Sequence, residues 1–382
     1  MNLLRYRRAV VAALATTALL GAAGVTTAES ASAAETHAQK QAQGHGKGHG
    51  KARHTSWNTL RGAAAASDRF AGVAVNADKL DDPVYEEIVR EQFNSITPEN
   101  AMKWESVEPE RGRYDWAAAD RIADYADANG QQLYGHVLVW HSQLPAWLGE
   151  GDFDAAELRE IMTDHIATEA GRYRGRVDRW DVVNEAFNED GTFRETVFYD
   201  KLGEDYIADA FRAAHKADPE AELYINDYNT DGLGPKSDGM YELVKKLKAE
   251  GVPIHGVGFQ GHLVLGQEPD SMRANLQRFA DLGVDVVVTE LDIRMETPAT
   301  EQKLRQQARE YKAVTDACLA VDRCDGVTVW GASDADSWIP GWFEGEGAAL
   351  LYDEEYQRKP AYYATRLAFQ IEGLKHLWPR RH

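Results

Sequence analysis

Short apolar runs of strand length recur along this chain from residue 70 onward, at intervals of roughly 25 to 45 residues. The segments between them have the apolar spacing of amphipathic helices. In residues 241–251, for example, Leu243, Val244 and Leu247 share one helical face, and Gly251 supplies a C-terminal stop. The eight apolar runs are residues 70–75, 93–98, 133–140, 179–185, 222–228, 256–262, 284–293 and 326–331.

The regular alternation of strand and helix decides the fold class that we expect. Strands separated by helices pair in parallel through right-handed crossovers. Eight such units fit closure into a barrel, and a barrel of about 250 residues or more commonly stands as one domain. We therefore predict an α/β protein with a single (β/α)8 barrel over residues 57–378. An open, doubly wound parallel sheet is the structural alternative.

Polar and aromatic side chains gather at the C-terminal ends of the apolar runs and seldom at their starts. They are Glu99 and Asn100 after the second run, Asn184 and Glu185 in the fourth, residues 226–228 in the fifth, Gln260 and His262 in the sixth, and Glu290 in the seventh. In a (β/α)8 barrel these ends meet at one mouth, where active sites lie. Segments far apart in the sequence are thus expected to form a single site.

Two of these residues, Glu185 and Glu290, carry the chemistry that the site suggests. Hydrolysis of a glycosidic bond needs a proton for the leaving oxygen and a carboxylate opposite the anomeric carbon. Glu185 is the candidate acid, because a second carboxylate nearby would raise its pKa. Glu290 is the candidate nucleophile, because Asp292 points the same way from the strand and His262 on the neighbouring strand could hold Glu290 ionised. For a strand-end glutamate taken singly, a structural ion pair is the alternative.

Tryptophans near the strand ends suggest that sugars stack there. Trp140, Trp330 and Trp338 lie at or just beyond the ends of their runs. At those positions a flat indole can stack on the apolar face of a pyranose ring. Trp180 begins its run and is assigned to packing instead.

Two histidines, His136 and His141, raise the alternative of a metal-assisted hydrolase on the same barrel. Their separation of five positions puts the two side chains on opposite faces of a strand, so they are poor joint ligands. We therefore expect no metal site. His136 is expected to hydrogen-bond sugar hydroxyls, with a role in the core as the alternative.

The first 34 residues have the pattern of an export signal. Arg5, Arg7 and Arg8 precede an apolar stretch, and a small-residue site follows at 31–33. The stretch is short for a membrane anchor, and the arginines do not distinguish the general export route from the twin-arginine route. We predict a secreted, extracellular protein with a signal peptide over residues 1–34.

Residues 35–56 form a tract rich in Gly, Gln, Lys and His. This composition cannot build a core, so we predict a disordered tether ahead of the barrel. Weak binding of a transition metal by His45, His49 and His54 is the alternative. The ordering cost of flexible imidazoles disfavours it.

Charge and cysteine content argue against several kinds of ligand. Residues 1–55 carry seven Lys or Arg and two Asp or Glu, a net +5, whereas the whole chain carries −20, so the rest carries −25. Such an acidic body repels nucleic acid and does not favour an anionic membrane surface. The two cysteines, Cys318 and Cys324, favour a local disulfide over a metal site in an exported protein, since no His or third Cys stands at ligand spacing.

Seven motifs in order resemble those of the family 10 glycoside hydrolases, the endo-1,4-β-xylanases of a retaining (β/α)8 clan. The likeness runs from about residue 57 to 375. The Cys318 and Cys324 pair fits a disulfide of bacterial members, and we expect a member of the actinobacterial type. The motifs are residues 97–109 (TPENAMKWESVEP), 135–148 (GHVLVWHSQLPAWL), 179–187 (RWDVVNEAF), 223–229 (LYINDYN), 258–262 (GFQGH), 289–294 (TELDIR) and 329–338 (VWGASDADSW).

The resemblance implies an activity and a set of residue roles. A member of this family would hydrolyse internal bonds of xylan or xylo-oligosaccharides by double displacement, and we expect a monomer without a cofactor. Glu185 would be the acid/base, with Asn184 beside it. Glu290 would be the nucleophile, supported by His262 and Asp292. The positions that match substrate-binding residues are Glu99, Asn100, Lys103, His136, Trp140, Asn184, Gln260, Trp330 and Trp338 around the cleaved bond, and Tyr228 toward the leaving group.

Two other functions stay open at this point. A cellulase or mannanase of the same clan would differ in whether its cleft admits a hydroxymethyl group. A non-catalytic barrel that binds polysaccharide could keep the tryptophans on the same fold. Nothing in such a binding protein would require both carboxylates together with His262.

Overall fold

The computed structural model describes residues 56–267 and 269–377. The predicted export signal over residues 1–34 lies outside the described residues, and so does the predicted tether apart from Ser56. Among the helices that the structure describes, none has the length and hydropathy to cross a membrane.

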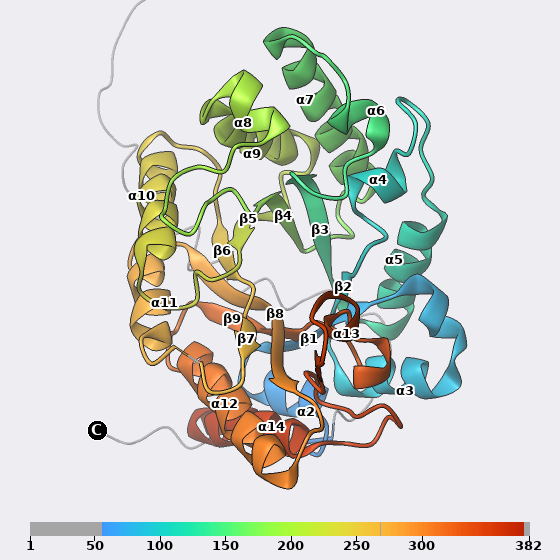
Figure 1. The fold of residues 1–382 in the computed structure, drawn as a ribbon, viewed down its shortest axis with the longest axis vertical. Helices are drawn as coiled ribbons and strands as arrows, with labels where there is room; N and C mark the ends of the chain where they lie inside the picture. Colours follow the sequence, from blue (N-terminus) through green and yellow to red (C-terminus); the bar gives the residue numbers. More distant parts are fainter. Residues whose placement is uncertain (1–55, 268, 378–382) are drawn as a thin grey trace, which may run out of the picture. The chain divides into compact units, whose positions relative to one another are not determined.

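Eight parallel strands form a closed barrel (Figure 1). Each strand pairs with the next in the order β1, β2, β3, β4, β5, β6, β8, β9, and β9 pairs back with β1. Their bounds are β1 Phe70–Val75, β2 Ser95–Pro98, β3 Gln132–Trp140, β4 Arg179–Asn184, β5 Glu222–Asp227, β6 Gly256–Phe259, β8 Asp285–Glu296 and β9 Cys324–Val329. The predicted (β/α)8 barrel is confirmed, and the open sheet is wrong because the first and last strands are hydrogen-bonded.

Helices connect the strands and surround the barrel (Figure 1). The helix expected over residues 241–251 ends at Ala249, and Gly251 follows it at φ +69°. The longer helices are α3 Pro83–Gln92, α5 Ala117–Asn129, α7 Ala155–Arg172, α9 Asp205–Ala217, α10 Pro235–Ala249, α11 Met272–Ala280, α12 Glu301–Leu319 and α14 Pro360–Leu377. The shorter ones are α2 Leu60–Ala66, η1 Ala77–Asp81, α4 Trp104–Val107, α6 Ala146–Gly149, α8 Val197–Leu202, η2 Asp334–Asp336 and α13 Ile339–Trp342.

The sixth apolar run differs from the prediction of one strand over residues 256–262. β6 ends at Phe259, and a separate strand, β7 (His262–Val264), pairs with the outer part of β8. Gly261 between them has φ +76°, a left-handed conformation that breaks the strand and that glycine adopts without strain. His262 therefore lies in register with Asp292, farther out along β8 than a continuous strand would place it.

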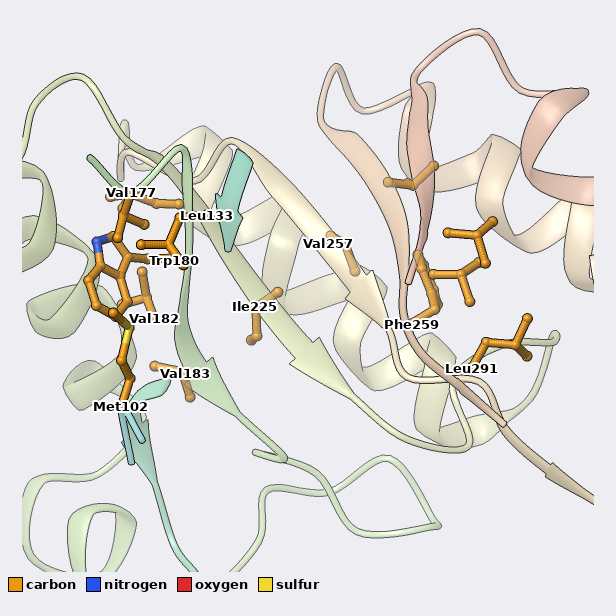
Figure 2. Close-up of a cluster of buried hydrophobic side chains, with 14 of the residues drawn as sticks. Met102, Leu133, Val177, Trp180, Val182, Val183, Ile225, Val257, Phe259 and Leu291 are labelled. Atoms are coloured by element: carbon orange, nitrogen blue, oxygen red, sulfur yellow. The ribbon is translucent and has the colours of Figure 1, made fainter. Parts of the chain in front are cut away.

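Trp180 is fully buried, as its assignment to packing predicted. Figure 2 shows it within a cluster of apolar side chains that includes Met102, Leu133 and Val177. A Cβ atom on Gly135 in the adjacent β3 would lie 2.3 Å from the indole ring, so only glycine fits there. The close approach of Gly135 to the Trp180 ring packs β3 against β4.

Charged side chains close the barrel at the end where the strands begin. Arg179, the first residue of β4, lies 3.2 Å from carboxylate oxygens of both Glu222 and Asp325. Tyr224 donates a hydrogen bond to the same Asp325 oxygen at 3.0 Å. These charge pairs support the fold rather than the chemistry, because the reacting groups of such barrels lie at the opposite mouth.

The predicted disulfide is confirmed. Cys318 in α12 and Cys324 at the start of β9 are joined, with an S–S length of 2.02 Å and a Cα–Cα distance of 5.3 Å. The closed loop spans six positions, so the bond constrains the unfolded chain only locally. Because Cys324 begins its strand, the disulfide lies away from the barrel mouth.

Candidate active site

Glu185 stands where β4 leaves the barrel. The strand ends at Asn184, and Glu185 has φ +56°, a conformation that a non-glycine residue keeps only when its neighbours hold it. Its N–H donates to the carbonyl of Asn226 at 2.8 Å. Gln260 Nε2 donates to Glu185 Oε1 at 3.2 Å, and His141 Nε2 lies 3.9 Å from Oε2. The carboxylate therefore lies at the mouth, beside the ends of β5 and β6.

The segment after Glu185 is tied to neighbouring groups that hold its backbone in place. Arg194 Nε donates to the carbonyl of Glu185 at 3.0 Å. The N–H of Phe187 donates to Asp227 Oδ2 at 3.1 Å, and Lys236 Nζ lies 3.0 Å from Asp227 Oδ1. Burial raises the pKa of Asp227 to about 7, although the charge of Lys236 opposes the rise. These bonds explain how the left-handed backbone at Glu185 is maintained.

Glu290 is the more buried carboxylate, with 4% of its surface exposed. Its N–H donates to the carbonyl of Gln260 at 2.8 Å. Asn226 Nδ2 donates to Oε1 at 2.7 Å, and His262 Nε2 lies 3.1 Å from Oε2. Burial alone would raise the pKa of Glu290, but the hydrogen bond from His262 and the charges of nearby histidines outweigh burial and lower this pKa. Glu290 is thus held in its ionised form.

His262 connects Glu290 to a second carboxylate. Its Nδ1 lies 2.9 Å from Asp292 Oδ2, and the indole N–H of Trp338 donates to the same oxygen at 2.9 Å. Burial alone would lower the pKa of His262, but the charge and hydrogen bond of Asp292, together with Glu290, raise it to about 10. His262 is therefore a cation at neutral pH and donates to both carboxylates.

Amide side chains join Glu185 to Glu290. Gln260 Nε2 donates to Asn184 Oδ1 at 3.1 Å in addition to its bond to Glu185. Asn226 Nδ2 donates to the same Asn184 oxygen at 3.0 Å in addition to its bond to Glu290. Amides do not titrate, so this network positions the two carboxylates without competing for their protons. The environments differ, because both oxygens of Glu290 have close donors whereas Glu185 has one amide donor.

Lys103 lies at the outer edge of this network. Its Nζ donates to Asn100 Oδ1 at 2.9 Å and to Gln143 Oε1 at 2.7 Å, and it stands 5.0 Å from the ring centroid of Trp140. Burial lowers the pKa of Lys103, opposed by the charges of nearby glutamates. Burial raises the pKa of Glu99, opposed by the charge of Lys103. Glu99, Asn100 and Lys103, the predicted residues after β2, therefore form a polar cluster, and Lys103 connects it to the ring of Trp140.

His136 and His141 have different partners, and His141 is the one that lies near Glu185. His136 Nδ1 lies 2.8 Å from Asp181 Oδ2, and Tyr134 donates to Asp181 Oδ1 at 3.0 Å. Among the described residues, one group of three ligand-type side chains, namely His136, Asp181 and Glu290, has atoms within 4.8 Å of one another. The imidazole–carboxylate bond and the two donors on Glu290 already engage these side chains. We therefore interpret them as part of the hydrogen-bonded network and assign no metal.

Aromatic side chains lie beside the groups that hold the two glutamates. The ring centroid of Trp330 lies 5.2 Å from that of His136 and 6.3 Å from that of His262, and only 8% of Trp330 is exposed. Tyr228, directly after β5, accepts a hydrogen bond on its hydroxyl from Arg194 Nη2 at 2.7 Å. Because Arg194 also binds the segment that follows β4, Tyr228 belongs to that side of the site.

Sequence reasoning missed the contributions of several residues. Asn226 was noted as a polar strand end, yet its bridging of two elements depends on barrel register. His141 was considered only as a metal ligand, although it lies near Glu185. Asp181 and Arg194 carry no local signal, because their partners come from other strands and loops. Residues of this kind are found only when the elements are placed in space.

The Asp292→Asn variant is expected to bring the titration of His262 into the neutral range. An asparagine oxygen can still accept from His262 and Trp338, but the charge that raises the pKa of His262 is gone. This pKa should fall from about 10 toward the ordinary histidine value of about 6.5. An NMR titration of the imidazole carbon-bound protons measures the change.

The matched control is Asp238→Asn, which removes one negative charge from the outer helix α10. Its imidazole titration should match that of the unaltered protein. An unchanged His262 titration in the Asp292 variant would show that another group keeps the imidazole protonated. Equal melting temperatures of the variants would confirm that the fold is kept.

Comparisons with known proteins place this geometry in a family. The model of glycosyl hydrolase family 10 matches residues 59–368. An endo-1,4-beta-xylanase of Agaricus bisporus is 50% identical over 307 residues, which cover 80% of this chain and 92% of that protein. The native xylanase 10B of Thermotoga maritima has a TM-score of 0.81 and 41% identity, covering 83% of this chain and 99% of the other. The expected actinobacterial type gains no support, because curated relatives such as the Agaricus protein are fungal.

Structures of a third similar protein contain bound sugars. The xylanase TsXylA of Thermoanaerobacterium saccharolyticum is 37% identical, with TM-scores of 0.76 and 0.75 for two variants that cover 80% and 79% of this chain and 97% of theirs. Each variant replaces one glutamate by alanine, and the complexes hold xylotetraose and xylotriose. The two replaced glutamates stand 105 positions apart, which is also the separation of Glu185 and Glu290.

Proposed function

The chain belongs to glycosyl hydrolase family 10, and from this premise we propose that it is a retaining endo-1,4-β-xylanase acting on xylan and xylo-oligosaccharides. The observation that carries the proposal is a pair of glutamates at the barrel mouth in unlike environments. Glu290 is hydrogen-bonded on both oxygens and kept ionised, while Glu185 is held at a strand end by one amide. These are the settings that a nucleophile and a proton carrier need.

The first step forms a covalent bond between enzyme and sugar. Glu290 attacks the anomeric carbon as the glycosidic bond breaks, and Glu185 gives its proton to the leaving oxygen. In the second step Glu185 takes a proton from water, and the oxygen of that water displaces Glu290 from the anomeric carbon. Both carboxyl groups return to their initial state, and two inversions at one carbon leave its configuration unchanged.

The groups around Glu290 support this role. The imidazolium of His262 orients the attacking carboxylate and keeps it unprotonated, and Asp292 keeps His262 charged. Asn226 orients the other oxygen of Glu290. His262, Asp292 and Asn226 are therefore proposed as positioning residues, because they act on the sugar through the nucleophile.

The remaining mouth residues are proposed to bind the polysaccharide. Lys103 with its neighbouring amides presents donors for sugar hydroxyls, and Trp140 and Trp330 present flat faces for pyranose rings. Tyr228 lies with the segment that follows Glu185, a position suited to the leaving-group side. The proposed substrate-binding residues are Glu99, Asn100, Lys103, His136, Trp140, Asn184, Gln260, Trp330, Trp338 and Tyr228.

Initial rates on an aryl xylobioside and an aryl cellobioside test the substrate. We expect kcat/KM to be about ten- to two-hundredfold higher for the xylobioside, because a cleft shaped for xylose excludes the extra hydroxymethyl group. NMR of the first product should show the β-anomer. An inverted anomer would contradict retention, and a higher rate on the cellobioside would point to a cellulase of the same clan.

The binding-protein alternative is tested on the polymer itself. The unaltered protein should release reducing sugar from xylan, and Glu290→Ala purified in the same way should not. Folded protein that binds xylan without releasing sugar would favour the non-catalytic alternative.

We also propose that the protein is exported and that the barrel domain begins near residue 57. Support comes from the arginines and apolar stretch of residues 1–34 and from the composition of residues 35–56. Mass spectrometry of protein collected from the medium measures the mature N-terminus. Retention of the intact leader inside the cell would contradict export.

A further inference from the structure

Trp342 is the most exposed large apolar side chain among the described residues, with 76% of its surface accessible. A large ring in water forgoes stabilisation that burial would provide. A single exposed apolar side chain is common on protein surfaces, so its position relative to the site decides what it signifies. The position of Trp342 relative to the carboxylates therefore matters.

Trp342 ends α13, and strand pairing places α13 at the barrel mouth. β8 continues past Glu290, and its last residues pair antiparallel with β10 (Glu346–Gly347). Because β10 follows α13 directly in the chain, both elements lie at the end of the barrel where β8 finishes. In Figure 1 the α13 label stands close to β1, β2 and β8.

A row of rings leads from the nucleophile to Trp342. The ring centroid of His262 lies 5.0 Å from that of Trp338, and Trp338 lies 6.4 Å from Trp342 at an interplanar angle of 47°. Trp338 is half-buried and bound to Asp292. Trp342 is thus the outer member of the row. The inner member, His262, lies 3.1 Å from Glu290.

The segment that carries Trp342 is fixed on both sides. Ile339, in the same short helix, is fully buried. Arg294 Nε lies 2.6 Å from Glu346, and its guanidinium stands 4.0 Å from the ring centroid of Phe343. A platform that is already ordered loses little conformational entropy when a ligand stacks on it.

We infer that Trp342 is a stacking platform for a pyranose ring of the same polysaccharide, farther from the cleaved bond than the two sugars of a xylobioside. This inference rests on the proposed function. The flat, uncharged indole matches the apolar face of a neutral sugar, and its place beyond Trp338 matches the next part of an extended chain. Trp342 binds substrate and takes no part in proton transfer or bond formation.

The test compares substrates of different length with Trp342→Ala and Trp342→Phe. For the alanine variant, kcat/KM on xylohexaose should fall about three- to tenfold, the range expected for one lost aromatic contact. The fall should lie in KM, because stacking outside the reacting bond stabilises ground state and transition state alike. Rates on an aryl xylobioside should not change, and Trp342→Phe should keep most of the activity on xylohexaose.

Tyr363→Ala is the matched control, because Tyr363 is an aromatic residue on α14 with 49% of its surface exposed. It should leave both substrates unaffected. Equal losses on long and short substrates for Trp342→Ala would overturn the inference and indicate a disturbed Trp338. No loss on xylohexaose would overturn it as well.

Retardation in native gels that contain xylan separates this inference from the proposed function. Migration of Trp342→Ala should be slowed less than that of the unaltered protein, whether or not xylan is cleaved. If the unaltered protein cleaves no xylan but Trp342→Ala still binds it more weakly, the proposed function fails and the platform stands. Equal retardation of the two proteins would overturn the platform even in an active enzyme.

Discussion

Glu290→Ala is expected to lower kcat/KM on xylan by roughly four orders of magnitude or more, because the oxygen that forms the covalent bond is lost. The donors from Asn226 and His262 remain in place around the vacated space. Added azide should attack the anomeric carbon there directly and give an azide product of inverted configuration. Reducing-sugar release over long incubations measures the residual rate, and NMR identifies the product.

Glu296→Ala is the control, since Glu296 is the exposed last residue of the same strand. It should keep the activity of the unaltered protein. Residual activity above about one per cent in Glu290→Ala would mean that another group forms the bond. Contamination is excluded when the residual rate is the same in independent preparations.

Glu185→Ala is expected to show a loss that depends on the leaving group. On xylan, whose leaving oxygen needs a proton, kcat/KM should fall by about two to four orders of magnitude. On a dinitrophenyl xylobioside the bond-forming step should be almost unaffected, because the phenolate leaves without a proton. Azide should then restore turnover by attacking the glycosyl-enzyme, with retention of configuration at the sugar. Pre-steady-state bursts and product NMR measure these effects.

Glu195→Ala provides the comparison, because Glu195 is an exposed glutamate in the segment that follows Glu185. It should behave as the unaltered protein on every substrate. Equal losses on good and poor leaving groups, with no response to azide, would remove Glu185 from the role of proton carrier. If Glu290→Ala shows the leaving-group dependence instead, the two roles are reversed.

The elements could be predicted from the sequence because burial leaves a local pattern. Each barrel strand overlaps one of the eight apolar runs, and the helix ahead of Gly251 ends where its apolar spacing ends. Because the C-terminal ends of the barrel strands meet at one mouth, Glu185 and Glu290 could be predicted to lie in the same site. The substrate class came from the resemblance of seven sequence motifs to a known family. The spacing of apolar and polar residues alone does not specify a substrate.

Other features had no local signal. The strand expected through residue 262 breaks at Gly261, because a left-handed glycine turns the chain before β7 pairs with β8. The left-handed backbone at Glu185 depends on bonds to Asn226 and Arg194, which are distant or lie in a loop. Such contacts are set by register around a closed barrel, and register is a property of all the strands together.

The sequence by itself determined the barrel and the disulfide pair and singled out Glu185 and Glu290 as candidates, since alternating apolar segments and polar strand ends are properties of short stretches of chain. Only the tertiary structure decided how the carboxylates differ. Glu290 is ionised because His262, held by Asp292, donates to it across two strands, and Trp342 stands at the mouth because β10 pairs with the end of β8. Hydrogen bonds and charges act through distances in space, and those distances exist only once the barrel has closed.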